Sequence, residues 1–175
     1  MSAPPPSPAP PAPDPCRRVA LFLANGFGLG NSPIASGTTG ALPGLLLAAA
    51  IWRFVPGVWA PAAIALVLTA AAIPLCDVAE RHYGRKDDGR IVADEWMTFP
   101  LCMVGLTAAN SGAWILGVAF VANRLCDIVK PFPAHRAQRL RGGLGIVADD
   151  AIAALYALIL VHAARLLAAR MGWAA

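Results

Sequence analysis

The sequence predicts an all-α membrane protein, a multi-pass bundle of about five transmembrane helices with a central helical hairpin. Hydrophobic residues make up 58% of the chain and charged residues only 14%, and the mean hydropathy is +0.60. A soluble domain has about 25% charged residues. The excess of Ala, Leu, Val and Ile occurs in uncharged blocks, which favours transmembrane helices over a soluble helical bundle with a large core.

The 175 residues are enough for one domain. We expect a disordered proline-rich tail over residues 1–15 and a single membrane domain over residues 16–175. The net charge of +4 does not indicate a nucleic-acid partner, because the basic residues lie in loops that are also rich in acids and form no stripe with aromatics. Basic loops beside apolar segments are typical of the cytoplasmic face of a membrane protein.

The first two membrane helices follow a polar segment. Residues 25–40 are rich in Gly, Asn, Ser and Thr, which favours a loop. We expect helix to resume near Ala41 and to end at residues 56–57, a Pro-Gly pair. The apolar run from Val58 to Cys76 falls in the range of about 17–25 residues that a crossing needs. A charged connection over residues 77–95 follows it.

The stretch from Trp96 to Asn123 contains no charged residue and decides the topology. If it crossed the membrane once, Asp94 and Glu95 would lie on the opposite side from Asp127. Residues 110–112, Asn-Ser-Gly, are instead typical of a turn in its middle. The acids at its two ends are therefore expected on the same face.

We accordingly predict two antiparallel helices, residues 91–109 and 112–130, each about 28 Å long at 1.5 Å per residue. Pro131 is expected to end the second helix at Lys130. A last helix is expected over residues 149–167, after a second polar connection. Five crossings place the amino terminus and both charged connections on the cytoplasmic side, in agreement with the positive-inside rule.

Charged residues at the ends of these helices are the candidate catalytic and metal-binding groups. They are Asp94 and Glu95, then Arg124, Asp127 and Lys130 at a spacing of three, and Asp149 and Asp150. The middle three share a helix face, and one acid between two bases suits a phosphate held beside Mg²⁺. The same spacing fits an interfacial ladder of salt bridges, and the paired acids also fit a preference for helix amino termini.

The other polar residues are less informative. The glycine-rich residues 142–145 are expected to form a loop whose N–H groups approach a ligand. Asp77 and Glu80 share a helix face and either join the acids or are solvated, whereas Asp87 and Asp88 are expected to be turn residues. No Cys is followed six residues later by Arg, and no Asp-x-Asp, P-loop or G-x-S-x-G motif occurs. Metal-assisted hydrolysis is the hydrolase chemistry that remains.

Four sequence blocks, in this order, resemble the phosphatidylglycerophosphatase A family of bacterial membrane phosphatases. They are GFGLGNSP with GTTG at residues 26–33 and 37–40, IVADE at 91–95, RLCDIVKPFP at 124–133 and GGLGIVADD at 142–150. The sequence departs from the family pattern at Ser36, Ala93, Thr98 and Cys126. None of these departures removes a carboxylate.

The resemblance implies Mg²⁺-dependent removal of the terminal phosphate from phosphatidylglycerol phosphate at the cytoplasmic face of the bacterial inner membrane. It also implies a site made of the residues singled out above, Asp94, Glu95, Arg124, Asp127, Lys130, Asp149 and Asp150. Asn31, Ser32 and Thr38, in the first matching loop, are expected to contact the phospholipid substrate together with Arg124 and Lys130. The alternative that we retain is a small cation transporter or channel subunit, since intramembrane carboxylates are also typical of ion paths.

Overall fold

A computed structural model describes residues 14–172, and every regular element within that range is a helix. The predicted proline-rich tail lies outside the described residues, apart from Asp14 and Pro15 at the start of the first helix. The helices in chain order are α1 (Pro15–Ala24), η1 (Leu29–Asn31), α2 (Ser36–Gly40), α3 (Leu42–Phe54), α4 (Trp59–Tyr83), α5 (Ala93–Thr98), η2 (Phe99–Met103), α6 (Trp114–Val129), α7 (Ala134–Ala137) and α8 (Gly143–Arg170).

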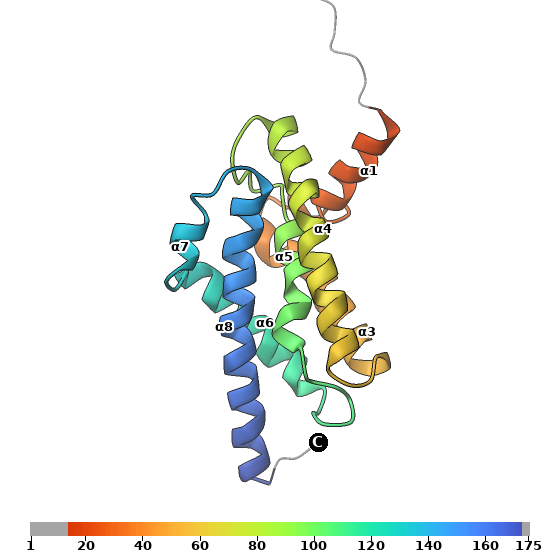
Figure 1. Cartoon of the computed structure of the whole chain (residues 1–175), viewed down its shortest axis with the longest axis vertical. Helices are drawn as coiled ribbons and strands as arrows, with labels where there is room; N and C mark the ends of the chain where they lie inside the picture. Colours follow the sequence, from red (N-terminus) through yellow and green to blue (C-terminus); the bar gives the residue numbers. More distant parts are fainter. Residues whose placement is uncertain (1–13, 173–175) are drawn as a thin grey trace, which may run out of the picture.

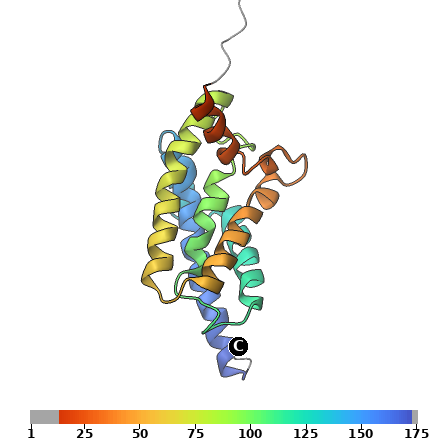
Figure 2. The same cartoon turned by 90° about the vertical axis from the view of Figure 1, so that its right-hand side faces the viewer.

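The α5–η2 segment runs through the middle of the bundle, with α3, α4, α6 and α8 around it (Figures 1 and 2). Its side chains form the core, and Phe99 and Cys102 have no exposed surface. Burial on all sides explains why this segment is uniformly apolar after its first turn. The helix α1 lies at one end of the bundle and the end of α8 lies at the other (Figure 1).

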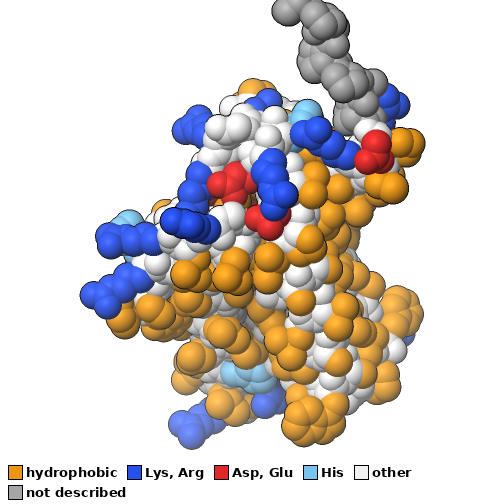
Figure 3. Space-filling view, turned by 45° about the horizontal axis from the view of Figure 1, so that its top comes forward, with side chains coloured by type: hydrophobic (Ala, Val, Ile, Leu, Met, Phe, Trp, Pro, Cys, Tyr) orange, Lys and Arg blue, Asp and Glu red, His pale blue; other side chains and the backbone are white. Residues whose placement is uncertain are grey.

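Within the part of the chain that the structure describes, two helices are long and apolar enough to cross a membrane, namely α4 and α8. The other helices of the bundle are shorter than the roughly 20 residues that a crossing needs, with 13 residues in α3 and 16 in α6. The five predicted crossings are therefore not confirmed. Hydrophobic side chains cover most of the surface in Figure 3, whereas Lys and Arg surround the acids at the upper end. This separation is consistent with association with a membrane.

The hairpin is confirmed in outline, but its first arm is shorter than predicted. Instead of a helix over residues 91–109, the chain forms α5 and then a 3₁₀ segment that ends at Met103. Pro100 has no N–H to donate within a helix, and Gly105 adopts a left-handed φ of 83°. The second arm is as predicted, since α6 ends at Val129 and Lys130 is its left-handed cap.

Two further boundaries differ from the prediction. Helix α4 continues through Asp77 to Tyr83, so the predicted connection begins seven residues too early. Helix α8 begins at Gly143 rather than at Asp149, so the glycine-rich run is its start and not a ligand-binding loop. A Cβ atom at Gly143 would collide with the carbonyl oxygen of Ile73 in α4. The glycine is therefore needed for close helix packing. The expectation of a loop that brings N–H groups near a ligand was wrong at this position.

Candidate active site

Three helix ends meet at the polar end of the bundle and bring the predicted charged residues together. Asp94 and Glu95 lie in the first turn of α5, where negative charge interacts favourably with the helix dipole. The hydroxyl of Thr98 donates to the carbonyl oxygen of Asp94 over 2.6 Å and closes that turn. Arg124 and Asp127 lie near the end of α6, and Asp149 and Asp150 lie in the second turn of α8.

Arg124 joins the two arms of the hairpin. Its Nη1 atom lies 3.4 Å from Oε2 of Glu95, and its Nη2 atom lies 3.3 Å from Oδ2 of Asp127. Only 9% of Arg124 is exposed, so these charges interact with little screening by water. The arrangement confirms that the acids at both ends of the uncharged stretch return to the same face.

Asp150 connects the remaining acids. Its carboxyl group lies close to those of Asp94 and Asp127, so the three acids repel one another. Lys130 donates to Oδ2 of Asp149 over 2.6 Å. The seven predicted catalytic residues therefore form a single cluster, which we call the acidic cluster: Asp94, Glu95, Arg124, Asp127, Lys130, Asp149 and Asp150.

The acidic cluster holds more negative charge than its own bases neutralise. Burial, opposed by Arg124 and reinforced by the charge of Asp127, raises the pKa of Glu95 to about 7. Burial and the nearby Glu95 charge raise the pKa of Asp94 well above its usual range. Oδ1 of Asp94 is buried and accepts no hydrogen bond from the described residues, and Oε2 of Glu95 has only its 3.4 Å ion pair with Arg124. Such groups are destabilising unless a cation, a proton or a ligand compensates them.

The unpartnered Oδ1 of Asp94, beside the carboxyl group of Glu95, fits a hard divalent cation, which prefers oxygen ligands. Within residues 14–172, no three His, Cys, Asp or Glu side chains stand in ligand geometry for a metal ion. A cation would therefore have to draw the carboxyl groups of the acidic cluster closer together. The residues suited to do so are Asp94, Glu95, Asp127, Asp149 and Asp150.

The glycine-containing loop packs against the acidic cluster through Gly37. A Cβ atom added there would lie 2.6 Å from Oε1 of Glu95 and 3.1 Å from Nη1 of Arg124. The predicted substrate contacts lie elsewhere in this loop: Asn31 exchanges hydrogen bonds with Asn25, and Ser32 bonds the backbone of Ile34. Thr38 is exposed. A role in substrate binding for Asn31, Ser32 and Thr38 stays a prediction.

Two polar residues near the acidic cluster were not predicted. Asp87, taken from the sequence for a turn residue, has a left-handed φ of 52° and accepts a 2.8 Å hydrogen bond from Gln138. Its charge is close enough to raise the pKa of Glu95. Asn123 is only 3% exposed and lies one helical turn before Asp127. The sequence signal for Asn123 was its position as the last residue of the uncharged stretch.

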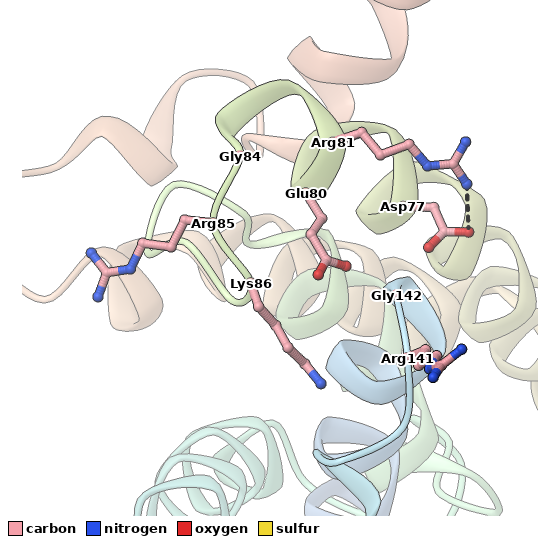
Figure 4. Close-up of a pocket in the computed structure, with 8 residues that line it drawn as sticks. All are labelled: Asp77, Glu80, Arg81, Gly84, Arg85, Lys86, Arg141 and Gly142. Atoms are coloured by element: carbon pink, nitrogen blue, oxygen red, sulfur yellow. Dashed lines mark ion pairs between the residues drawn. The ribbon is translucent and has the colours of Figure 1, made fainter.

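Asp77 and Glu80 do not join the acidic cluster. They line a separate pocket of about 550 Å³ near the start of α8. Asp77 accepts a 2.6 Å hydrogen bond from the N–H of Gly143 and pairs with Arg81, as Figure 4 shows. Arg81 and Arg85 point away from Glu80 in different directions, so the basic groups do not converge on one anion.

Replacing Gly37 by alanine is expected to lower turnover by about 10²-fold, the cost of misplacing a catalytic group by about 1 Å. The added methyl group displaces the flexible end of Glu95 and separates it from Arg124. The melting temperature should change little, because only a side-chain terminus moves. Gly117→Ala is the matched control, since a Cβ atom there meets open space. Equal turnover in both variants would contradict the placement of Glu95.

Comparison with known sequences points to the same family as the four sequence blocks. Residues 22–165 match the sequence profile of the phosphatidylglycerophosphatase A family. A Haemophilus influenzae protein named phosphatidylglycerophosphatase A is 35% identical over 86% of this chain and 94% of its own length. The Escherichia coli protein of the same name is 33% identical over 75% of each chain.

A Bacteroides thetaiotaomicron protein, provisionally named as a phosphatidylinositol-3-phosphatase, is 32% identical over 84% of this chain and 94% of its own length. No solved structure is a significant match to the chain.

Proposed function

The chain belongs to the phosphatidylglycerophosphatase A family and is a phosphatase, and we propose that it converts phosphatidylglycerol phosphate to phosphatidylglycerol with the help of Mg²⁺. The observation that supports this most is the acidic cluster. Five acids and two bases from three helices meet at the polar end of an apolar bundle. The comparisons give no support to the alternative of a cation transporter.

The bases of the acidic cluster suit the recognition of a phosphate group. Arg124 presents a planar guanidinium whose Nε atom is buried and makes no hydrogen bond to the described residues, while Nη2 has only its 3.3 Å ion pair with Asp127. The Nε–H group is free to donate to a phosphate oxygen as charge shifts in the transition state. Lys130 is held by Asp149 and supplies a second positive charge from the end of α6.

Hydrolysis also needs an activated water molecule. A bound Mg²⁺ would neutralise the phosphate and orient that water. Asp94 or Glu95, Asp127, and Asp149 or Asp150 would hold the ion. A carboxylate that is not a ligand would accept the proton of the water, and the raised pKa of Glu95, at about 7, suits that transfer near neutral pH.

Apolar side chains beside the acidic cluster suit a lipid substrate. Leu125, Ile128 and Val129 on α6, and Phe132 after it, are all more than half exposed. They lie within five residues of Asp127 or Lys130 in sequence, so the acyl chains and the phosphate could be held on adjacent surfaces. We propose that the protein is a multi-pass protein of the bacterial inner membrane and that this end faces the cytoplasm, where positively charged loops concentrate.

Phosphatidylinositol 3-phosphate is the second candidate substrate, favoured by the name of the Bacteroides relative. Like phosphatidylglycerol phosphate, it is a phosphate monoester on a hydroxyl-bearing phospholipid head group. The two substrates should therefore be compared in the same assay.

The proposed function is tested by phosphate release from each lipid by the purified protein in detergent. Removal of divalent cations with EDTA should abolish turnover, and added Mg²⁺ should restore it, because uncatalysed monoester hydrolysis is extremely slow. Undiminished turnover in EDTA would reject the role of the metal. A higher kcat/KM for phosphatidylinositol 3-phosphate would replace the proposed substrate by the second candidate.

A further inference from the structure

Asn123 is a buried polar residue that the reaction outlined above does not use. It is 3% exposed, and its Oδ1 atom has no hydrogen-bond donor among the described residues. Leaving a buried acceptor unpaired destabilises the folded state. Buried polar groups of this kind are expected to have a partner in the functional state.

The register of α6 places Asn123 beside the acidic cluster. It precedes Asp127 by four residues, so the two side chains differ in direction by only about 40° at 3.6 residues per turn. Lys130, three residues after Asp127, pairs with Asp149 on α8, and α6 packs against α8, so this strip of α6 faces α8. The residue one turn beyond Asp150 is Ala154, which is fully buried and has no side-chain donor for the amide.

Asn123 lies on the apolar side of the acids. The helix α6 runs toward the polar end, where it stops at Val129, so Asn123 is about 6 Å deeper than Asp127 at 1.5 Å per residue. In a phospholipid with a terminal phosphate, the polyol that carries the phosphate is closer to the acyl chains than the phosphate is. When the phosphate contacts Arg124, this polyol would lie at the level of Asn123.

The chemistry of Oδ1 of Asn123 restricts which groups of a substrate can pair with it. An amide oxygen only accepts hydrogen bonds, and an ionised phosphate offers no donor. A hydroxyl group does offer one. We propose that Oδ1 of Asn123 accepts a hydrogen bond from the hydroxyl next to the terminal phosphate, and that Asn123 selects polyol head groups; this proposal rests on the function proposed above. Asn123 is thus a specificity-determining residue.

Two substrates that differ only in this hydroxyl test the proposal. They are phosphatidylglycerol phosphate and phosphatidyl-1,3-propanediol phosphate, which has the same charges and no free hydroxyl in its head group. The wild-type protein should show a kcat/KM about tenfold higher for the hydroxyl-bearing lipid, the value of about one hydrogen bond. Asn123→Leu, of similar shape but without an acceptor, should hydrolyse both lipids equally.

Stability distinguishes selectivity from a structural role. Replacing an unpaired buried amide by an apolar side chain should leave the melting temperature of Asn123→Leu unchanged or higher. If this variant does not fold, Asn123→Ala provides the same comparison. If the wild-type protein has the same kcat/KM for both lipids, the proposal is overturned, and the partner of the Asn123 amide is a bound water. Equal loss on both lipids with a lower melting temperature would also overturn it, whereas hydrolysis of neither lipid by the wild type would refute the proposed function itself.

Discussion

Replacing Asp127 by asparagine is expected to lower kcat by about 10²–10³-fold, the range observed when one preorganised group is removed from a transition-state site. Asp127 is at the centre of the acidic cluster, since it pairs with Arg124 over 3.3 Å and lies close to the carboxyl group of Asp150. The amide keeps the size of the side chain but removes its negative charge. It therefore weakens both the binding of a cation and the positioning of the guanidinium.

The same substitution should have little effect on folding. The side chain of Asp127 is 20% exposed, and a neutral amide relieves repulsion among closely spaced acids. Expression and melting temperature are therefore expected to stay near wild-type values while phosphate release falls. Glu80→Gln, which makes the same chemical change in the separate pocket, is the matched control. Near-normal turnover in Asp127→Asn would remove Asp127 from the site.

The Mg²⁺ requirement of the Asp127 variant gives a second measurement. If Asp127 is a metal ligand, higher Mg²⁺ concentrations should restore part of the lost activity, because the defect is partly one of affinity. If Asp127 only orients Arg124, added Mg²⁺ should have no effect on the loss. The two roles are thus separable in one titration.

The sequence was sufficient to predict the composition of the acidic cluster. Charged residues are rare next to apolar runs, and the turn at residues 110–112 implied that Asp94 and Asp127 lie on one face. The structure confirms this return through the contacts of Arg124. The prediction succeeded because charge in an apolar chain is strongly restricted in position.

Helix boundaries and close packing were less predictable. The 3₁₀ geometry of η2 depends on Pro100 within a fully buried segment, where packing overrides helix propensity. The role of Gly143 depends on the carbonyl oxygen of Ile73, which is 70 positions away in sequence. Asp87 lies in a turn, as predicted, but its hydrogen bond from Gln138, 51 positions away in sequence, could not be predicted. Such long-range contacts leave no local pattern in a single sequence.

Replacing Arg124 by lysine should be almost as damaging as the loss of Asp127, with a decrease in kcat of about 10²-fold. Arginine contacts Glu95 and Asp127 at the same time through two nitrogen atoms and keeps its Nε–H group free for phosphate. A lysine ammonium is a single point charge and does not reproduce this planar fork. One of the two acids would lose its partner, and the phosphate would lose the Nε–H donor.

This prediction separates recognition by geometry from recognition by charge. If Arg124 acts only through its positive charge, the lysine variant should retain most of its activity, and the interpretation of Arg124 as a phosphate ligand would fail. If geometry matters, both kcat and KM should worsen, and the melting temperature should also fall because a buried carboxylate is left unpaired. Arg81→Lys is the control, since Arg81 pairs with Asp77 at an exposed position in the separate pocket. Each of these two arginines contacts an acid, but Arg124 is buried between the hairpin arms and Arg81 is at the surface. A loss of activity in the Arg124 variant alone would therefore come from its place in the site and not from the change of arginine to lysine.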